Sequence, residues 1–255
     1  MHRHAISVLV LVALGFTLSG CGGGTYTWGW HVVSPFDSRG QTNITFLLHG
    51  LGYTLGVAVT AIALSVFLGL IVALPNLTKN RALNLASRCY VETFRSVPML
   101  VMILWVYYGV PVLTGIEFSV FVAGVIAVAL CDSAFEAEIF RAGIQSVERG
   151  QTEAADSLGL SFADKLRFII LPQAIRRVLP PLGNQFVYML KASSLLSVIG
   201  LSELTRRANE LVVTEFRPLE IYSFLVLEYL ALILVASWAV RRLEYRMARS
   251  ERTAE

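Results

Sequence analysis

Five apolar runs, each about as long as a membrane-crossing helix, constrain this chain more than any other feature. A bilayer core offers no water to unpaired backbone groups, so a chain crosses it as helices of about 20 residues. Apolar residues make up 55% of the chain and charged residues only 15%, against roughly 25% charged in a typical soluble domain. We therefore expect an all-α membrane protein with about five transmembrane helices, at 46–74, 91–113, 118–135, 179–199 and 222–240.

Basic residues gather in three regions beside these runs. They lie between the first two runs, in the long link after the third, and after the last, with examples at Lys79, Arg81, Arg88, Arg149, Lys165, Arg241, Arg242 and Arg246. The positive-inside rule places all three regions, and hence the C-terminus, in the cytoplasm. The basic residues form no aromatic-interleaved patch, so the net charge of +3 indicates topology and not nucleic-acid binding.

The first 21 residues have the pattern of a signal segment. Arg3 precedes an apolar run at 5–18, about the length of a signal-peptide core. The following Leu18-Ser19-Gly20-Cys21 resembles a lipobox, in which Cys21 would be lipidated and become the new N-terminus. An uncleaved sixth helix and a wrongly assigned start codon are the alternatives. We expect 22–45 to be an external linker. The three cysteines are scattered, which predicts neither a metal site nor a disulfide framework.

A polar, charge-rich segment, EAADSLGLSFADKLRFIILP at 153–172, lies between the third and fourth runs. Gly159 can take the left-handed conformation that ends a first helix. Ser161 can cap a second helix, with Asp164 completing a capping box, and Pro172 is expected to stop that helix. Such an ordered loop between spans predicts a docking surface for a partner.

This segment matches without a gap the signature of binding-protein-dependent ABC import permeases, namely EAA, three residues, Gly, nine residues and I-x-LP. Further stretches resemble the polar amino-acid branch of that family, whose solutes are His, Glu, Gln, Arg and opines. They are 92–98 (ETFRSVP), 107–111 (YYGVP), 137–141 (AEIFR) and 180–184 (PPLGN). The chain departs from the branch at 99–102 (MLVM), where a Gln is usual, and at 191–195 (KASSL), where K-D-T-S-L is usual.

The resemblance implies a type I ABC importer transmembrane fold over 46–242, with 243–255 as a basic cytoplasmic tail, in the bacterial inner membrane. It implies a permease subunit that imports polar amino acids or their derivatives and is not itself an enzyme. The implied partners are a cytoplasmic ABC ATPase dimer that holds ATP and Mg, a periplasmic or external solute-binding protein, and a second permease subunit. No cofactor or metal is expected on this chain. Coupling to the ATPase would use Glu153, Ala154, Ala155, Gly159, Leu160, Ile169, Leu171 and Pro172.

Polar residues within the apolar runs are costly, and they are commonly functional. Candidates for the translocation path or its gate are Lys191, Ser193, Ser194, Asn184 and Gln185. Lys191 could instead pair with Glu228 or extend its amine to the membrane surface. Asp132 and Glu136 share one helix face, where we expect Glu136 to be hydrated, and Glu92 with Arg95 is expected to form an i,i+3 surface pair.

Two other functions remain open from the residues alone. A stand-alone channel or secondary carrier would favour inverted repeats or paired broken helices, and neither is visible in the sequence. A membrane scaffold that recruits an ATPase is the other. The chain has no phosphate-binding loop and no metalloprotease motif, so an importer of the type that it resembles needs energy from outside the chain.

Overall fold

The computed structural model describes residues 26–78 and 80–252, so the expectations for 1–21, including lipidation of Cys21, lie outside the described residues. The chain divides into two units, 1–30 and 31–255. In the first, the Trp28 and Trp30 rings stack with centroids 5.4 Å apart. The second unit contains all the α-helices named below.

The described residues form helices and no strand, which confirms the all-α class. The α-helices are α2 Ser38–Ala73, α3 Arg81–Ser96, α4 Met99–Leu104, α5 Val110–Thr114, α6 Val120–Gln145, α7 Arg149–Ser157, α8 Phe162–Lys165, α9 Leu171–Ala192, α10 Leu204–Glu215 and α11 Pro218–Arg252. Short 3-10 helices are η1 Trp30–Val33, η2 Leu74–Leu77 and η5 Ser193–Ile199. Two π-helical turns are η3 Trp105–Gly109 and η4 Leu166–Ile170.

Three of the described helices are long and apolar enough to cross a membrane, namely Ser38–Ala73, Val120–Gln145 and Pro218–Arg246. Two bent pairs raise the number to five if each pair counts as one span: α3 with 99–114, and 162–199 with α10. Up to five spans agrees with the expectation of about five. Of the most apolar window of α11, only 6% is buried within the chain.

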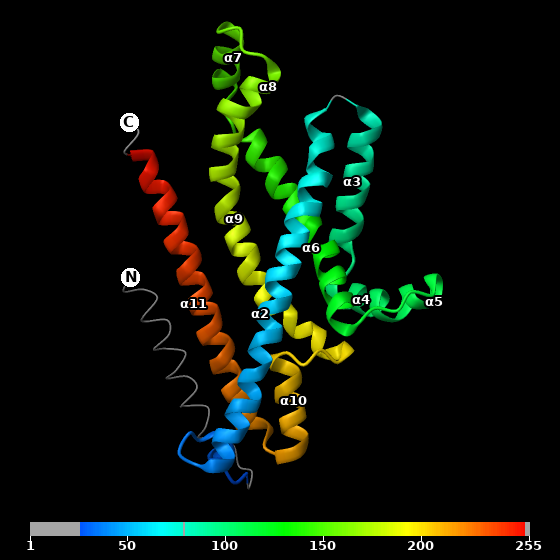
Figure 1. Ribbon diagram of the computed structural model, residues 1–255, viewed down its shortest axis with the longest axis vertical. Coiled ribbons are helices and arrows are strands. Elements are labelled where there is room, and N and C mark those ends of the chain that lie inside the picture. The colour runs from blue at the N-terminus through cyan, green and yellow to red at the C-terminus, as the bar shows by residue number, and fades with distance from the viewer. Residues whose placement is uncertain (1–25, 79, 253–255) are drawn as a thin grey trace. The chain divides into compact units, whose positions relative to one another are not determined.

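The second predicted span is not one straight helix. The chain bends by 99° between α3 and the segment 99–114, and Figure 1 shows α4 and α5 turned sharply away from α3. Val97 is extended, with φ −85° and ψ 126°, because the ring of Pro98 disfavours the helical conformation in the residue before it. Pro98 and Pro111 are expected from the sequence to bend or bound this span, and the bend at Pro98 confirms that expectation.

Several helices also extend beyond the predicted spans. Asp37 caps α2 by accepting hydrogen bonds from the backbone N–H groups of Arg39 and Gly40, so helix begins within the predicted linker. α6 continues to Gln145, past the predicted end at 135. α11 continues to Arg252, so most of the predicted tail is helical.

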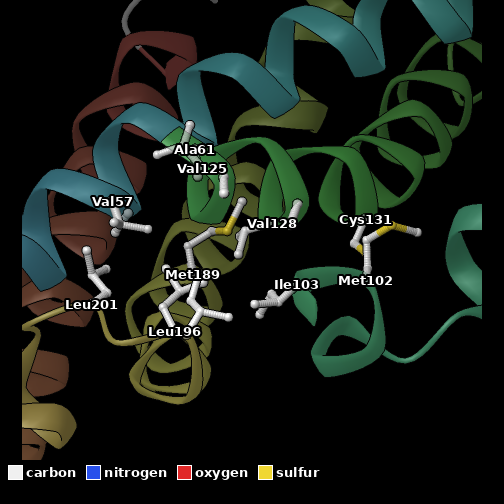
Figure 2. Close-up of a cluster of buried hydrophobic side chains, with 14 of the residues drawn as sticks. Val57, Ala61, Met102, Ile103, Val125, Val128, Cys131, Met189, Leu196 and Leu201 are labelled. Carbon is white, nitrogen blue, oxygen red and sulfur yellow. The ribbon is translucent and has the colours of Figure 1, made fainter. Parts of the chain in front are cut away.

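Small residues let α2 and α6 pack closely. A Cβ atom placed on Gly69 would lie 2.5 Å from the Cβ of Glu136, so no larger residue fits there without a shift. Beside this contact lies the main apolar cluster, to which α2, α4, α6 and α9 contribute (Figure 2). It includes Val57 and Ala61 of α2, Ile103 of α4, Val128 of α6 and Met189 of α9. This cluster packs α6 against α9, the two helices that flank the charge-rich loop at 153–172.

Candidate functional site

The loop between α6 and α9 is a helix-turn-helix, as the sequence predicted. α7 ends at Ser157, and Gly159 takes a left-handed conformation with φ +69°. The Gly159 N–H donates to the Asp156 carbonyl at 3.0 Å, and the Leu160 N–H donates to the Ala155 carbonyl at 3.1 Å. These bonds satisfy the carbonyls at the end of α7, in the manner of a glycine C-cap.

Ser161 caps the second helix as predicted. Its Oγ accepts a hydrogen bond from the Asp164 N–H at 3.2 Å and donates one to Asp164 Oδ2 at 2.6 Å. Lys165 also reaches back across the turn, where its Nζ lies 2.6 Å from Asp156 Oδ1. The turn and this ion pair together fix the angle between α7 and α8.

The prediction that Pro172 stops the second helix is wrong. α8 continues through the π-helical turn η4 into α9, and Pro172 lies in the first turn of α9. The Leu171 N–H donates to the carbonyl of Leu166, five residues back. This wider turn accommodates the ring of Pro172, which has no backbone N–H to donate. The loop is therefore continuous with a predicted membrane span.

The residues of the signature do not all face outward. Glu153 and Ala154 are exposed, whereas Ala155 is only 1% exposed and lies inside the helix-turn-helix. Large apolar side chains are exposed instead, with Leu158 at 79%, Phe162 at 65% and Phe168 at 64%. Sequence reasoning missed these three, although Leu158 and Phe162 flank the predicted Gly159 turn. Exposed aromatic and aliphatic residues gathered on one loop are typical of a protein-binding surface.

The base of the loop is tied to the bundle where α6 meets α9. The Arg177 guanidinium donates to the carbonyl of Ser146, just beyond the end of α6. Gly143 of α6 leaves room for the side chain of Val178 on α9, and an added Cβ would collide with it. A movement of the loop therefore acts directly on two bundle helices.

The predicted path residues lie on α9 and at the start of η5, and they differ in exposure. Asn184 and Lys191 are exposed, one on each side of Tyr188, so the three lie along one face of the helix. Ser193 is fully buried, and its Oγ donates to the Leu190 carbonyl at 2.8 Å. Ser194 donates to the Lys191 carbonyl at 2.8 Å. A groove of about 410 Å³ beside α11 is lined by Lys191, Ser194 and Tyr229, among others.

Pairing of Lys191 with Glu228 does not occur among the described residues. Glu228 lines a different, apolar groove with Leu48 and Leu204, and neither of its carboxylate oxygens has a hydrogen-bond partner among the described residues. Lys191 instead faces the groove that Tyr229 lines. Glu228 and Tyr229, which are neighbours on α11, thus line two separate grooves.

Asp132 and Glu136 are both fully buried, so the expected hydrated position of Glu136 is wrong. The close approach of α2 at Gly69 covers Glu136. Gln185 donates a hydrogen bond to Asp132 Oδ1. Gln185, which neighbours the exposed Asn184, therefore links α9 to the buried carboxylate of Asp132 on α6.

Two motifs that lie far apart in the sequence meet in a cavity of about 510 Å³ between α3 and α6. Glu138 and Arg141 form a bidentate pair, with N–O distances of 3.1 and 2.7 Å. The predicted pair of Glu92 with Arg95 is not formed among the described residues. Arg95 instead lies over the Phe135 ring, 5.1 Å from its centroid.

The described residues contain no group of three or more metal-ligating side chains.

Known proteins resemble this chain over most of its length. Residues 65–249 match the family described as binding-protein-dependent transport system inner membrane component. The chain is 36% identical over 205 residues to the glutamine transport system permease protein GlnP of Escherichia coli, covering 80% of this chain and 94% of that protein. It is 39% identical over 208 residues to a probable glutamine ABC transporter permease protein of Bacillus subtilis, covering 82% and 96%. A crystal structure of an amino acid ABC transporter with histidines superposes with a TM-score of 0.77 at 38% identity, covering 84% and 100%.

Proposed function

Because this chain belongs to the binding-protein-dependent transport system inner membrane component family, we propose that it is the permease subunit of an importer for polar amino acids or their derivatives. The relatives named for glutamine and for amino acids support this class of solute. The exposed helix-turn-helix at 149–165 carries the proposal, since a carrier working alone would have no use for such a surface.

The docking face of the loop comprises the exposed side chains of Glu153, Ala154, Leu158 and Phe162. It binds a groove on a cytoplasmic ATPase, which holds ATP and Mg. Gly159 and Leu160 shape the turn, while Ile169, Leu171 and Pro172 join the loop to α9. When ATP closes an ATPase dimer, the loop moves as a rigid body and shifts α6 and α9, which alternates access between the two sides.

We propose that the loop and the C-terminus lie in the cytoplasm. Within the second unit, the α2–α3 connection, α7, α8 and the far end of α11 lie toward one end, and α10 lies at the other (Figure 1). The three basic regions lie at the first of these ends, which is the arrangement expected for cytoplasmic segments. α10 would then face the external or periplasmic solute-binding protein.

The solute path runs along the exposed face of α9. Asn184 and Lys191 line it directly, and Ser194 lines it beside the α11 groove. Gln185 and Ser193 support that face from behind, through Asp132 and the Leu190 carbonyl respectively. A second permease subunit, identical or different, closes the path from the opposite side. The importer domain spans 46–242, and the basic tail comes after it.

The decisive experiment is reconstitution in nanodiscs with the partner ATPase and solute-binding protein, combined with a screen of amino acids and opines. One loaded binding protein should stimulate ATP hydrolysis. Glu153→Lys and Glu153→Gln should abolish or reduce that stimulation. Glu117→Gln, which alters an exposed carboxylate in the α5–α6 connection, should leave it unchanged. A stable complex that no solute stimulates would instead favour the membrane-scaffold function.

A further inference from the structure

The polar cavity between α3 and α6 has no part in the proposed solute path along α9. Its volume of about 510 Å³ falls in the range of roughly 300–1,000 Å³ that small-ligand pockets occupy. α3 contributes Arg88, Glu92 and Arg95, and α6 contributes Glu138 and Arg141. Val91 is the only apolar side chain among the described residues that line it. Arg88, Glu92 and Arg95 are exposed, so a ligand can reach their charged groups.

The charges in the cavity are only partly neutralised by one another. Arg141 is paired with Glu138 and also donates to Gln145 at 2.9 Å. On α3, the side chains of Arg88, Glu92 and Arg95 make no hydrogen bond or ion pair within the described residues, while Arg95 stacks on Phe135 and its charge also acts on Glu138. These three lie at spacings of four and three residues, so they share one helix face. That face presents a cation, an anion and a second cation in order.

A second unsatisfied group lies on the same helix. Asn84 Oδ1 is buried and has no hydrogen-bond partner among the described residues, although the Asn84 amide donates to the Thr78 carbonyl at 3.2 Å. Asn84 also lines the cavity. Because the chain itself covers this oxygen, a ligand in the cavity meets the charged side chains of α3 and not Asn84 Oδ1.

The complementary ligand carries an oxyanion and an ammonium group. Guanidinium groups bind carboxylates through paired N–H···O bonds. A carboxylate such as that of Glu92 accepts hydrogen bonds from an ammonium. Among the described lining residues, polar and charged side chains predominate and Val91 is the one apolar residue, which favours a polar ligand over the acyl chains of a phospholipid. We propose that this cavity binds a free α-amino acid, with its carboxylate on Arg88 and Arg95 and its ammonium on Glu92, which lies between them on the helix; the choice of amino acids rests on the proposed function.

The cavity adjoins the path without being part of it. Arg95 and Glu138 also line a second cavity, of about 520 Å³, together with Gln185 and Pro181 of α9. These two side chains therefore stand between the amino-acid site and the α9 face. The site opens near the start of α3 and the end of α6, at the end that the basic residues assign to the cytoplasm. It is thus a product-side site, which fills as imported solute accumulates.

The test measures equilibrium binding to this chain in complex with its ATPase, without the binding protein, in phosphatidylcholine nanodiscs. The probes are the twenty radiolabelled common L-amino acids. At least one should bind saturably, and Arg88→Gln and Glu92→Gln should each weaken it tenfold or more. Arg81→Gln is the matched control, because Arg81 is an exposed arginine on the same helix that does not line the cavity.

The chemistry of the ligand gives a second measurement. The decarboxylated amine of the bound amino acid should bind wild-type protein at least tenfold more weakly than the acid. Arg88→Gln should bind the acid and the amine alike, because the carboxylate has lost its partner. A variant that merely unfolds would lose both ligands and its normal gel-filtration profile, and Glu92→Gln, which preserves side-chain shape, guards against that interpretation.

Three results overturn the proposal. They are no saturable binding of any of the twenty amino acids, binding that neither variant weakens, and retention of phosphatidylethanolamine that depends on Arg88 while no amino acid binds. The last result would assign the cavity to a lipid headgroup. Solute-stimulated ATP hydrolysis with the binding protein, measured in parallel, separates the two conclusions: stimulation without binding removes the site and leaves the import function intact.

Discussion

Lys165 Nζ lies 2.6 Å from Asp156 Oδ1, so the Lys165 side chain of α8 contacts the last turn of α7. The Lys165 side chain is 14% exposed and that of Asp156 is 60% exposed. An ion pair that is partly open to water contributes little to stability, about 0–1 kcal/mol. Because this ion pair spans the Gly159 turn, it restrains the angle between α7 and α8, the two helices of the loop that we propose docks on the ATPase.

Replacing Lys165 with Ala should therefore change coupling more than stability. We expect a change in unfolding free energy of under ~1 kcal/mol, together with a several-fold loss of solute-stimulated ATP hydrolysis. Lys165→Arg, which can still reach Asp156, should retain most of the stimulation. Thermal unfolding and ATPase assays on the same nanodiscs would check both, and full stimulation in Lys165→Ala would refute the bracing role.

Gly159→Val should disturb the turn between α7 and α8. A left-handed conformation costs a residue with a Cβ atom roughly 1–2 kcal/mol, and more for a branched one, so α7 and α8 should lose their fixed angle and uptake should fall strongly. Gly150→Ala is the matched control, because Gly150 is helical and an added Cβ there meets nothing within 4 Å. Normal uptake by Gly159→Val at normal membrane levels would rule out a role of the Gly159 turn in coupling.

Leu158→Ser and Phe162→Ser should weaken binding of the ATPase while leaving the fold intact. Both side chains are mostly exposed, at 79% and 65%, so their removal opens no cavity in the core. Pull-down of the ATPase by each variant measures the effect. Val213→Ser, at an exposed apolar position on α10, should bind the ATPase normally. Equal retention by all three variants would contradict the docking face.

Gly69→Val should destabilise the bundle itself. The added Cβ would lie 2.5 Å from the Cβ of Glu136 and 3.0 Å from the Ser133 carbonyl, which forces α2 and α6 apart. Overpacking of this kind typically costs about 1–3 kcal/mol, so the unfolding midpoint in detergent should fall. Gly52→Ala, with nothing within 4 Å of the new Cβ, should leave the midpoint unchanged.

Cys21→Ser should block lipid attachment if the Leu18-Ser19-Gly20-Cys21 stretch is a lipobox. Only a lipidated Cys21 would incorporate a fatty-acid probe through that thiol. Labelling of the wild-type chain in cells, with in-gel detection, gives the comparison. Unchanged labelling of Cys21→Ser would leave the uncleaved helix and the misassigned start as the remaining alternatives.

The docking loop could be predicted closely because its signals are local. A positive φ at Gly159 and the cap at Ser161 depend on residues a few positions away, which the sequence displays. The effect of Pro172 could not be predicted in the same way. The proline ring forbids one hydrogen bond, but whether the helix ends or widens by one residue depends on the packing of the next segment, and here α9 must continue into the bundle.

Charged residues in the spans were predicted least well, because their surroundings come from other helices. Glu136 is buried by Gly69 of α2, and Arg95 finds the Phe135 ring of α6 and not its near neighbour Glu92. Spacing within one helix shows which side chains share a face. It does not show which helix will cover that face.

The scant burial of α11 has a consequence for how the protein is made. With 6% of its most apolar window buried against the rest of the chain, this helix gains little from its own bundle. Its hydropathy alone must carry it into the bilayer as it leaves the insertion machinery, before any lateral partner is available. Biogenesis should therefore tolerate conservative apolar exchanges along α11 at the stage of insertion, and defects from such exchanges should surface only when subunits assemble.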